Sequence, residues 1–116
     1  MPYIAQKDRS ELDGLIDQLS DRIVSQSKSY GYDGAFAGLL NYTTTSLAMS
    51  IVNKQFGGLR YWQIATLTGT FHNIADEFYR MVAVPYENIQ IAKSGNVDGY
   101  VTALDRLHSK IATSNQ

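Results

Sequence analysis

Apolar residues recur at steps of three and four along most of the chain, which is the spacing of one face of an α-helix. The first such run predicts a helix over residues 8–26. Asp8 and Glu11 have the spacing of a capping box and are expected to form its start. Its apolar face consists of Leu12, Leu15, Ile16, Leu19, Ile23 and Val24.

Three further helices are predicted over residues 35–56, 59–83 and 98–112. Asp33 is a suitable N-cap for the first of these, and the Gly57-Gly58 pair is expected to end it. The helix predicted over residues 59–83 has the longest apolar stripe. This helix is expected to end or kink near Ala83 or Val84, just before Pro85. This stripe consists of Ile64, Leu67, Phe71, Ile74, Phe78, Met81 and Pro85.

These patterns together predict an all-α fold. The serine- and glycine-rich residues 27–32 are expected to form a loop, and the last residues, 113–116, to fray. Residues 1–116 are expected to form one domain, a small bundle of three main helices and a shorter C-terminal helix.

Charged side chains are scarce in the middle of the chain. Between Asp33 and Asp76 the only ones are Lys54 and Arg60, which flank the predicted turn at Gly57-Gly58. A surface helix of a monomer normally presents a charged face to water. The two helices therefore predict a central hairpin that is covered on more than one side, either within a bundle or by another subunit.

Composition excludes several classes of protein. The chain of 116 residues has no cysteine, so disulfides, thiolate metal sites and cysteine nucleophiles are absent. Its net charge of -1 and scattered basic residues argue against nucleic acid as a partner. Residues 34–52 are too rich in threonine and serine to form a membrane span. The first nine residues have no apolar run, so no signal peptide is expected, and we expect a soluble, cytoplasmic protein.

Conventional catalytic signatures are missing. His72 and Asp76, with Glu77 adjacent, have the spacing of a metal-binding pair, but a helix-surface contact is the favoured interpretation because the only other histidine, His108, lies on another predicted helix. Asp13, Asp17 and Asp21 lack the paired acidic motifs of all-α pyrophosphohydrolases. We therefore predict no catalytic residue, no metal site and no cofactor.

A polar and aromatic cluster surrounds the predicted kink. Glu77 and Arg80 are three residues apart and can form an ion pair on one helix. Arg80 beside Tyr79, with Tyr86 after the kink, has the chemistry to bind an anion or stack on a planar ligand. The alternative is that the cluster only fixes the angle of the helix at Pro85.

The ordered set of short motifs along the chain resembles a family of short proteins. The motifs are Met1-Pro2-Tyr3-Ile4 with Asp8-Arg9, Leu40-Asn41-Tyr42 with Thr44, Glu77-Phe78-Tyr79-Arg80, and Pro85-Tyr86-Glu87. The family is encoded mainly by bacteriophages and environmental viral genomes, and its function is unknown. The resemblance covers residues 1–97 and implies that Asn41, Tyr42, Glu77, Tyr79, Arg80 and Tyr86 form a shared ligand-binding cluster.

The chain departs from the family pattern in three places. Met81 stands where a second arginine is usual, Ser94-Gly95-Asn96 replaces a more acidic ending, and the segment after Gly99 is additional. The resemblance implies a small viral protein, located in the host cytoplasm, and implies no activity.

Three functional hypotheses follow. The leading one is a non-enzymatic protein that forms a homo-oligomer through residues 39–82 and binds a host or viral component. The second is a protein that binds a small ligand or nucleotide, with metal-dependent nucleotide hydrolysis as one form of it. The third is a component of the virion or of its assembly.

Overall fold

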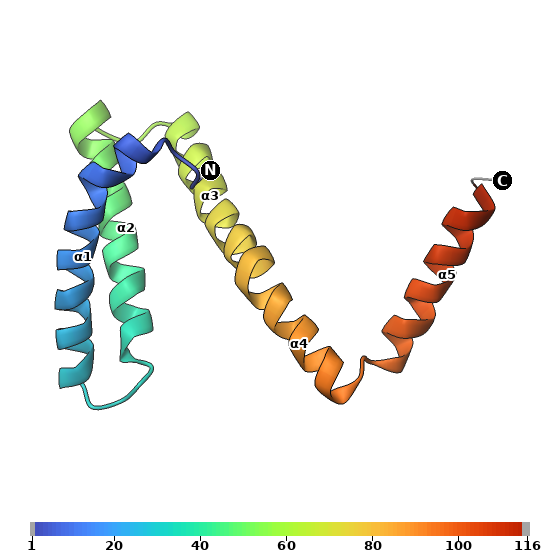
Figure 1. The fold of residues 1–116 in the computed structure, drawn as a ribbon. Helices are drawn as coiled ribbons and strands as arrows, with labels where there is room; N and C mark the ends of the chain where they lie inside the picture. Colours follow the sequence, from blue (N-terminus) through green and yellow to red (C-terminus); the bar gives the residue numbers. More distant parts are fainter. Residues whose placement is uncertain (1, 115–116) are drawn as a thin grey trace. The chain divides into compact units, whose positions relative to one another are not determined.

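The protein is all-α in the computed structural model, which describes residues 2–114 and has no strand in that range. No helix among these residues combines the length and apolar character needed to cross a bilayer. The elements are α1 (Gln6–Ser29), α2 (Ala35–Phe56), α3 (Tyr61–Phe78), the π-helical segment η1 (Tyr79–Ala83), α4 (Val84–Ser94) and α5 (Asp98–Ser114) (Figure 1).

The chain divides into two compact units. The first ends at Ile74, within α3, and the second begins at Ala75. The expectation that residues 1–116 form a single domain stays a prediction.

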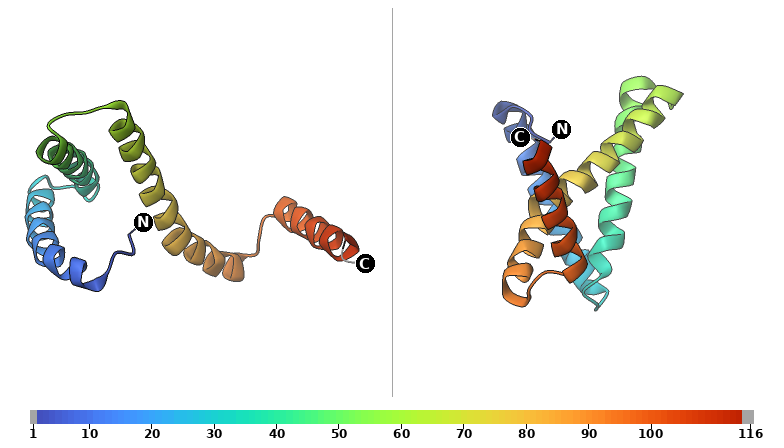
Figure 2. Two further views of the ribbon diagram at one scale, coloured as in Figure 1. Left: turned by 90° about the horizontal axis from the view of Figure 1, so that it is seen from above. Right: turned by 90° about the vertical axis from the view of Figure 1, so that its right-hand side faces the viewer.

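In the first unit, α1 and α2 lie side by side and run in opposite directions (Figures 1 and 2). A short link, Tyr30–Gly34, joins them, and it contains Gly31 at φ 77°. The helix α2 ends at Gly57, whose φ of 76° places it in the left-handed region that glycine adopts most readily. The predicted bounds of this helix, 35–56, are confirmed.

The first unit has few buried apolar side chains and leaves the predicted apolar faces open. The only buried apolar residues among those described are Ala35, 5% exposed, and Val52, 4% exposed. Leu47 on α2 is 55% exposed, and Leu15 on α1 is 63% exposed. The stripes that the sequence marks as core are therefore not covered within this unit.

The start of α3 is held by a side-chain cap. The Oε1 atom of Gln63 accepts a hydrogen bond of 2.6 Å from the backbone N–H of Arg60, the residue just before the helix. Gln63 is only 3% exposed. Beside this cap, the rings of Phe56 and Trp62 meet edge to face with centroids 5.1 Å apart. These contacts fix the turn that contains Gly57 and Gly58.

The predicted central hairpin is not formed within the described residues. From the turn at Gly57 and Gly58, the part of α3 in the first unit diverges from α2 instead of packing along it (Figures 1 and 2). The paired helices are α1 and α2. Both predicted arms are helical, but the second begins at Tyr61 instead of residue 59. Apolar periodicity does not say which helices pair.

In the second unit, Pro85 does not end the helix. Helical backbone continues from α3 through η1 into α4, with Pro85 in the first turn of α4. Proline lacks an N–H and its ring clashes with the carbonyl four residues earlier. The wider turn of η1, in which the Val84 N–H bonds to the Tyr79 carbonyl, accommodates both effects. Of the two outcomes predicted near residues 83 and 84, an end of the helix is wrong for this reason, and a kink stays a prediction.

Other predicted boundaries also need correction. The first helix begins at Gln6 after Ala5 and has no side-chain cap, so the capping box at Asp8 and Glu11 is not formed. It continues to Ser29, through part of the expected loop. The N-cap of α2 is Gly34 instead of Asp33.

The last helix, α5, has two more residues at its end than predicted, Thr113 and Ser114. The remaining positions of the expected frayed tail, 115–116, lie outside the described residues.

Candidate functional site

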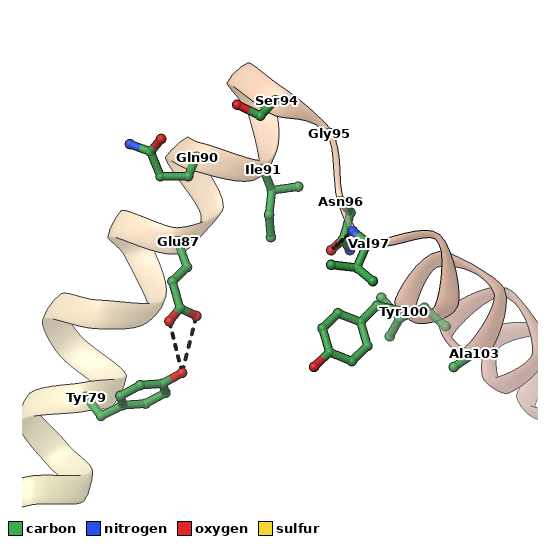
Figure 3. Close-up of a pocket in the computed structure, with 11 residues that line it drawn as sticks. Tyr79, Glu87, Gln90, Ile91, Ser94, Gly95, Asn96, Val97, Tyr100 and Ala103 are labelled. Atoms are coloured by element: carbon green, nitrogen blue, oxygen red, sulfur yellow. Dashed lines mark hydrogen bonds between the residues drawn. The ribbon is translucent and has the colours of Figure 1, made fainter.

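The second unit contains a groove between α4 and α5. Its volume is about 710 Å³, which lies within the usual range for small-molecule pockets, roughly 300–1,000 Å³. The link after α4 forms its closed end (Figure 3). The lining consists of Tyr79, Glu87, Gln90, Ile91, Ser94, Gly95, Asn96, Val97, Tyr100, Ala103 and Leu104.

The most specific contact in the groove joins Tyr79 and Glu87. The Tyr79 hydroxyl donates a hydrogen bond shared by both Glu87 carboxylate oxygens, at 3.1 and 3.2 Å (Figure 3). In a regular α-helix, residues eight apart lie about 80° apart around the axis. The π-helical segment between these two residues adds about one residue to the turn and brings them close to one face.

The carboxylate changes the acidity of the phenol. Its hydrogen bond to Glu87, and secondarily the charge of Glu87, raise the pKa of Tyr79 above its ordinary value of 10.0. Both effects favour the neutral phenol, which donates a hydrogen bond to the carboxylate. Tyr79 is therefore expected to act as a hydrogen-bond donor throughout the physiological pH range.

A second polar pair follows from the same helical segment. The Arg80 guanidinium and the Glu77 carboxylate form an ion pair at 2.6 Å. The side chain of Arg80 is 66% exposed and that of Glu77 is 27% exposed. The predicted i,i+3 pair is confirmed. Because the pair is open to solvent, its contribution to stability is small.

The structure distributes the predicted ligand-binding residues between the two units. Glu77, Tyr79, Arg80 and Tyr86 belong to the second unit, whereas Asn41 and Tyr42 lie on α2 in the first. Of the four in the second unit, only Tyr79 lines the groove. Asn41 lines a shallow pocket of its own unit that Phe71 also borders, and Tyr42 is 73% exposed. A common cluster of all six stays a prediction.

Sequence reasoning missed most of the groove, in particular Glu87, Gln90 and Tyr100. The Ser94-Gly95-Asn96 motif is a usable signal, because serine, glycine and asparagine favour a turn, and a turn there separates two helices that meet. The position of Glu87 relative to Tyr79 had no such signal, since it depends on the π-helical segment.

No cluster suited to a metal ion occurs among residues 2–114: no three or more histidine and carboxylate side chains come together there. The pair at His72 and Asp76 has no third ligand in this part of the chain. The arrangement described here provides hydrogen bonding and aromatic surface, with Glu87 as the only charged side chain of the groove lining.

One protein-family model covers most of the chain. Residues 1–97 match the model of a family described as a domain of unknown function (DUF6899). The chain belongs to this family. The matched region of DUF6899 includes Tyr79 and Glu87 but ends before Tyr100, so α5 lies outside the family region. No curated protein and no solved structure matches the chain.

Membership in DUF6899 supports the resemblance described above in its extent, residues 1–97. The family description names no activity, substrate or partner. The surfaces of the helices are therefore the available indication of what the chain binds.

Proposed function

We propose that this protein is a virus-encoded, non-enzymatic interaction protein that works as a homo-oligomer in the host cytoplasm. The subunits associate through the apolar faces of α1, α2 and α3, and the assembly binds a viral or host component. The helical bundle expected from the sequence is then built from helices of more than one copy.

One observation carries this proposal: the apolar stripes of the first unit are exposed. Leu19 on α1, Leu40 on α2 and Ile64 on α3 are 42%, 53% and 49% exposed. Each helix repeats this pattern along its length. Exposed apolar residues are normal when they are scattered, but contiguous patches mark interaction surfaces.

Energetics supports the same conclusion. Full burial of a large aliphatic or aromatic side chain contributes about 1.5–3 kcal/mol. Isolated helices are marginal in water and depend on the packing of an amphipathic face. Two buried apolar side chains, Ala35 and Val52, provide little such packing for a unit of this size. Burial of the apolar stripes against another protein surface therefore stabilises the helices strongly.

The charge pattern favours a second copy of the chain as the surface that buries these apolar stripes. The stretch between Asp33 and Asp76 offers only Lys54 and Arg60 to attract a charged partner. Surfaces of this kind resemble obligate interfaces, which are similar to a domain core divided between subunits. A symmetric pair of identical chains makes each apolar stripe available to its equivalent.

Sedimentation velocity over a micromolar concentration series tests the proposal. We expect the sedimenting mass to correspond to two or more chains, with dissociation only on dilution. A compact species with the mass of one chain throughout the series would overturn it.

The two other hypotheses stay predictions. Binding of nucleotides with magnesium can be tested by thermal shift, because a ligand at a hundredfold excess over its Kd stabilises the folded state by about 2.7 kcal/mol. A panel without any shift would discard this hypothesis. Co-purification with virus particles would indicate a virion component.

A further inference from the structure

The groove between α4 and α5 has a single charged side chain in its lining, and that charge is negative. Glu87 lines the groove, whereas no lysine, arginine or histidine among residues 2–114 does so. Lys93 and Asp98, on either side of its closed end in the sequence, lie outside the lining and have opposite charges. The end of α4 and the start of α5 also have opposite partial charges. Glu87 therefore determines which sign of charge the groove attracts.

The Glu87 carboxylate is held in place without being neutralised. The ion pair of this unit joins Arg80 to Glu77, and no basic side chain among residues 75–114 forms one with Glu87. Its hydrogen bonds of 3.1 and 3.2 Å come from the Tyr79 hydroxyl, which is a neutral donor. Since an ionised carboxylate accepts about four hydrogen bonds, Glu87 keeps both its charge and acceptor capacity for a ligand.

Two tyrosine rings line the same groove from different helical segments. Tyr79 belongs to η1 and lies beside Glu87, whereas Tyr100 belongs to α5 and lies across the groove from them (Figure 3). The two tyrosines are 52% and 65% exposed, so their rings are accessible to a ligand. The face of an aromatic ring attracts ammonium groups, and the attraction increases when water is displaced. A carboxylate between two such rings has the chemistry to bind an organic cation.

The rest of the lining favours a cation that has an apolar body. Ile91, Val97 and Leu104 add apolar surface to the groove. An ion pair in contact with water contributes little by itself, so an inorganic cation would gain little here. A ligand with an apolar body beside its charge also buries the apolar surface. The groove volume of about 710 Å³ is large enough for such a molecule.

We infer that the groove binds a small organic cation, an ammonium group attached to an apolar or aromatic body. The ammonium group contacts the Glu87 carboxylate and the ring of Tyr100, and the body packs against Ile91 and Leu104. Because Tyr100 and Leu104 lie outside residues 1–97, the DUF6899 region alone does not complete the site.

This ligand site is separate from the apolar faces of the first unit and does not depend on the proposed function. A monomer in sedimentation would overturn the proposed function and leave the site unaffected. The site also has the opposite charge preference to a nucleotide site, since phosphate groups would meet the Glu87 carboxylate.

A matched series of ligands tests this inference in the full-length protein. Phenethylamine, phenethyl alcohol and hydrocinnamate share a phenyl ring on a short chain, and at neutral pH they are a cation, a neutral molecule and an anion. NMR titration of the isotope-labelled protein measures both the Kd and the place of binding. We expect phenethylamine to bind about tenfold more tightly than phenethyl alcohol. Its shifts should fall on the amides of residues 94–97 and Tyr100, and hydrocinnamate should not saturate.

Variants of the groove identify the groups that select the cation. Glu87→Gln is expected to abolish the preference for the amine over the alcohol, and Tyr100→Leu to weaken amine binding severalfold. Glu77→Gln and Tyr86→Leu are the matched controls, because they remove a carboxylate and an exposed tyrosine of the same unit that do not line the groove. Circular dichroism of each variant establishes that it is folded.

Several outcomes would overturn the inference. Equal binding of the amine and the alcohol would show that the carboxylate does not select charge, and shifts outside the groove would place the ligand elsewhere. Equal effects of the groove variants and their controls, or no saturable binding of phenethylamine, would also overturn it. If a groove variant does not fold, the ratio of Kd values in the natural chain and the position of its shifts still decide.

Discussion

The Tyr79 hydroxyl donates to both carboxylate oxygens of Glu87, which follows it by eight residues in the sequence. The bond spans the position where Pro85 would otherwise disrupt the helix. It connects the first residue of η1 to the first turn of α4. Its most direct consequence concerns titration.

The folded chain favours the neutral form of Tyr79. Because the Glu87 contact raises the pKa of Tyr79, its contribution to stability is fully present below the unfolded value, near 10.0, and is lost as pH rises through the raised value. We expect the free energy of unfolding to decrease above about pH 10 more steeply in the natural chain than in Tyr79→Phe. Chemical denaturation at a series of alkaline pH values measures this difference.

Absorbance of tyrosinate provides a direct test of the same contact. The chain has eight tyrosines, and the ionisation missing from Tyr79→Phe is expected to be a late one. The Glu87→Gln variant should move this ionisation toward lower pH, because it removes the charge that opposes it. The Tyr86→Phe variant removes a tyrosine outside this bond and is the control. An early ionisation missing from Tyr79→Phe would contradict the contact.

The buried cap at Gln63 predicts a loss of stability on truncation. Gln63→Ala leaves the Arg60 N–H without its acceptor, which is expected to cost about 1 kcal/mol. Urea denaturation followed through Trp62, the only tryptophan, measures the change. Gln18→Ala on the exposed surface of α1 is the control and is expected to change the unfolding free energy by less than about 0.5 kcal/mol. Equal effects of the two variants would contradict a role for Gln63 as a cap.

The end of α2 predicts substitutions of opposite sign. Gly57 has a left-handed φ of 76°, so Gly57→Ala is expected to destabilise the fold by about 1–2 kcal/mol even though a Cβ would meet no atom within 4 Å. Gly14 lies inside α1 and also has open space around it. Gly14→Ala is therefore expected to stabilise by up to about 1 kcal/mol. Thermal unfolding of both variants gives the comparison, and a shared sign would be the contradicting result.

The apolar stripe of α3 provides the mutational test of self-association. Ile74 is 56% exposed in the single chain, so Ile74→Asp would be nearly neutral for a monomer. In an oligomer that covers this face, it places an unpaired charge in the interface and should dissociate or unfold the protein. Asn73→Asp changes an exposed neighbour of the stripe and should leave the sedimenting mass unchanged. If Ile74→Asp leaves the sedimenting mass unchanged, α3 is not part of the interface.

Local signals predicted the helices well, and long-range relationships were not predictable. The end of α2 followed from Gly57, whose backbone freedom can be predicted from the sequence. The first helix continued past its expected end because serines entered its last turn, where the Ser29 hydroxyl donates to the Gln26 carbonyl at 2.6 Å. Pro85 looked like a terminator because only its local effect is visible in the sequence.

The candidate site also combines a local contact that was predictable with a longer-range contact that was not. The Glu77–Arg80 pair depends on spacing within one helical turn and was predictable. The Tyr79–Glu87 contact depends on a change of helical geometry between its two residues, and no pattern in the sequence indicates that change. The pairing of α1 with α2 instead of α2 with α3 depends on relative burial, which periodicity alone does not contain.

The π-helical segment also sets the phase of the helix that follows it. If the same residues formed a regular α-helix, every later side chain would be rotated by about 100° relative to Tyr79. Glu87 would then turn away from the phenol, and the α4 wall would present different residues to α5. A related chain that is one residue shorter at this position would have the same phase with a regular α-helix and would therefore keep this groove.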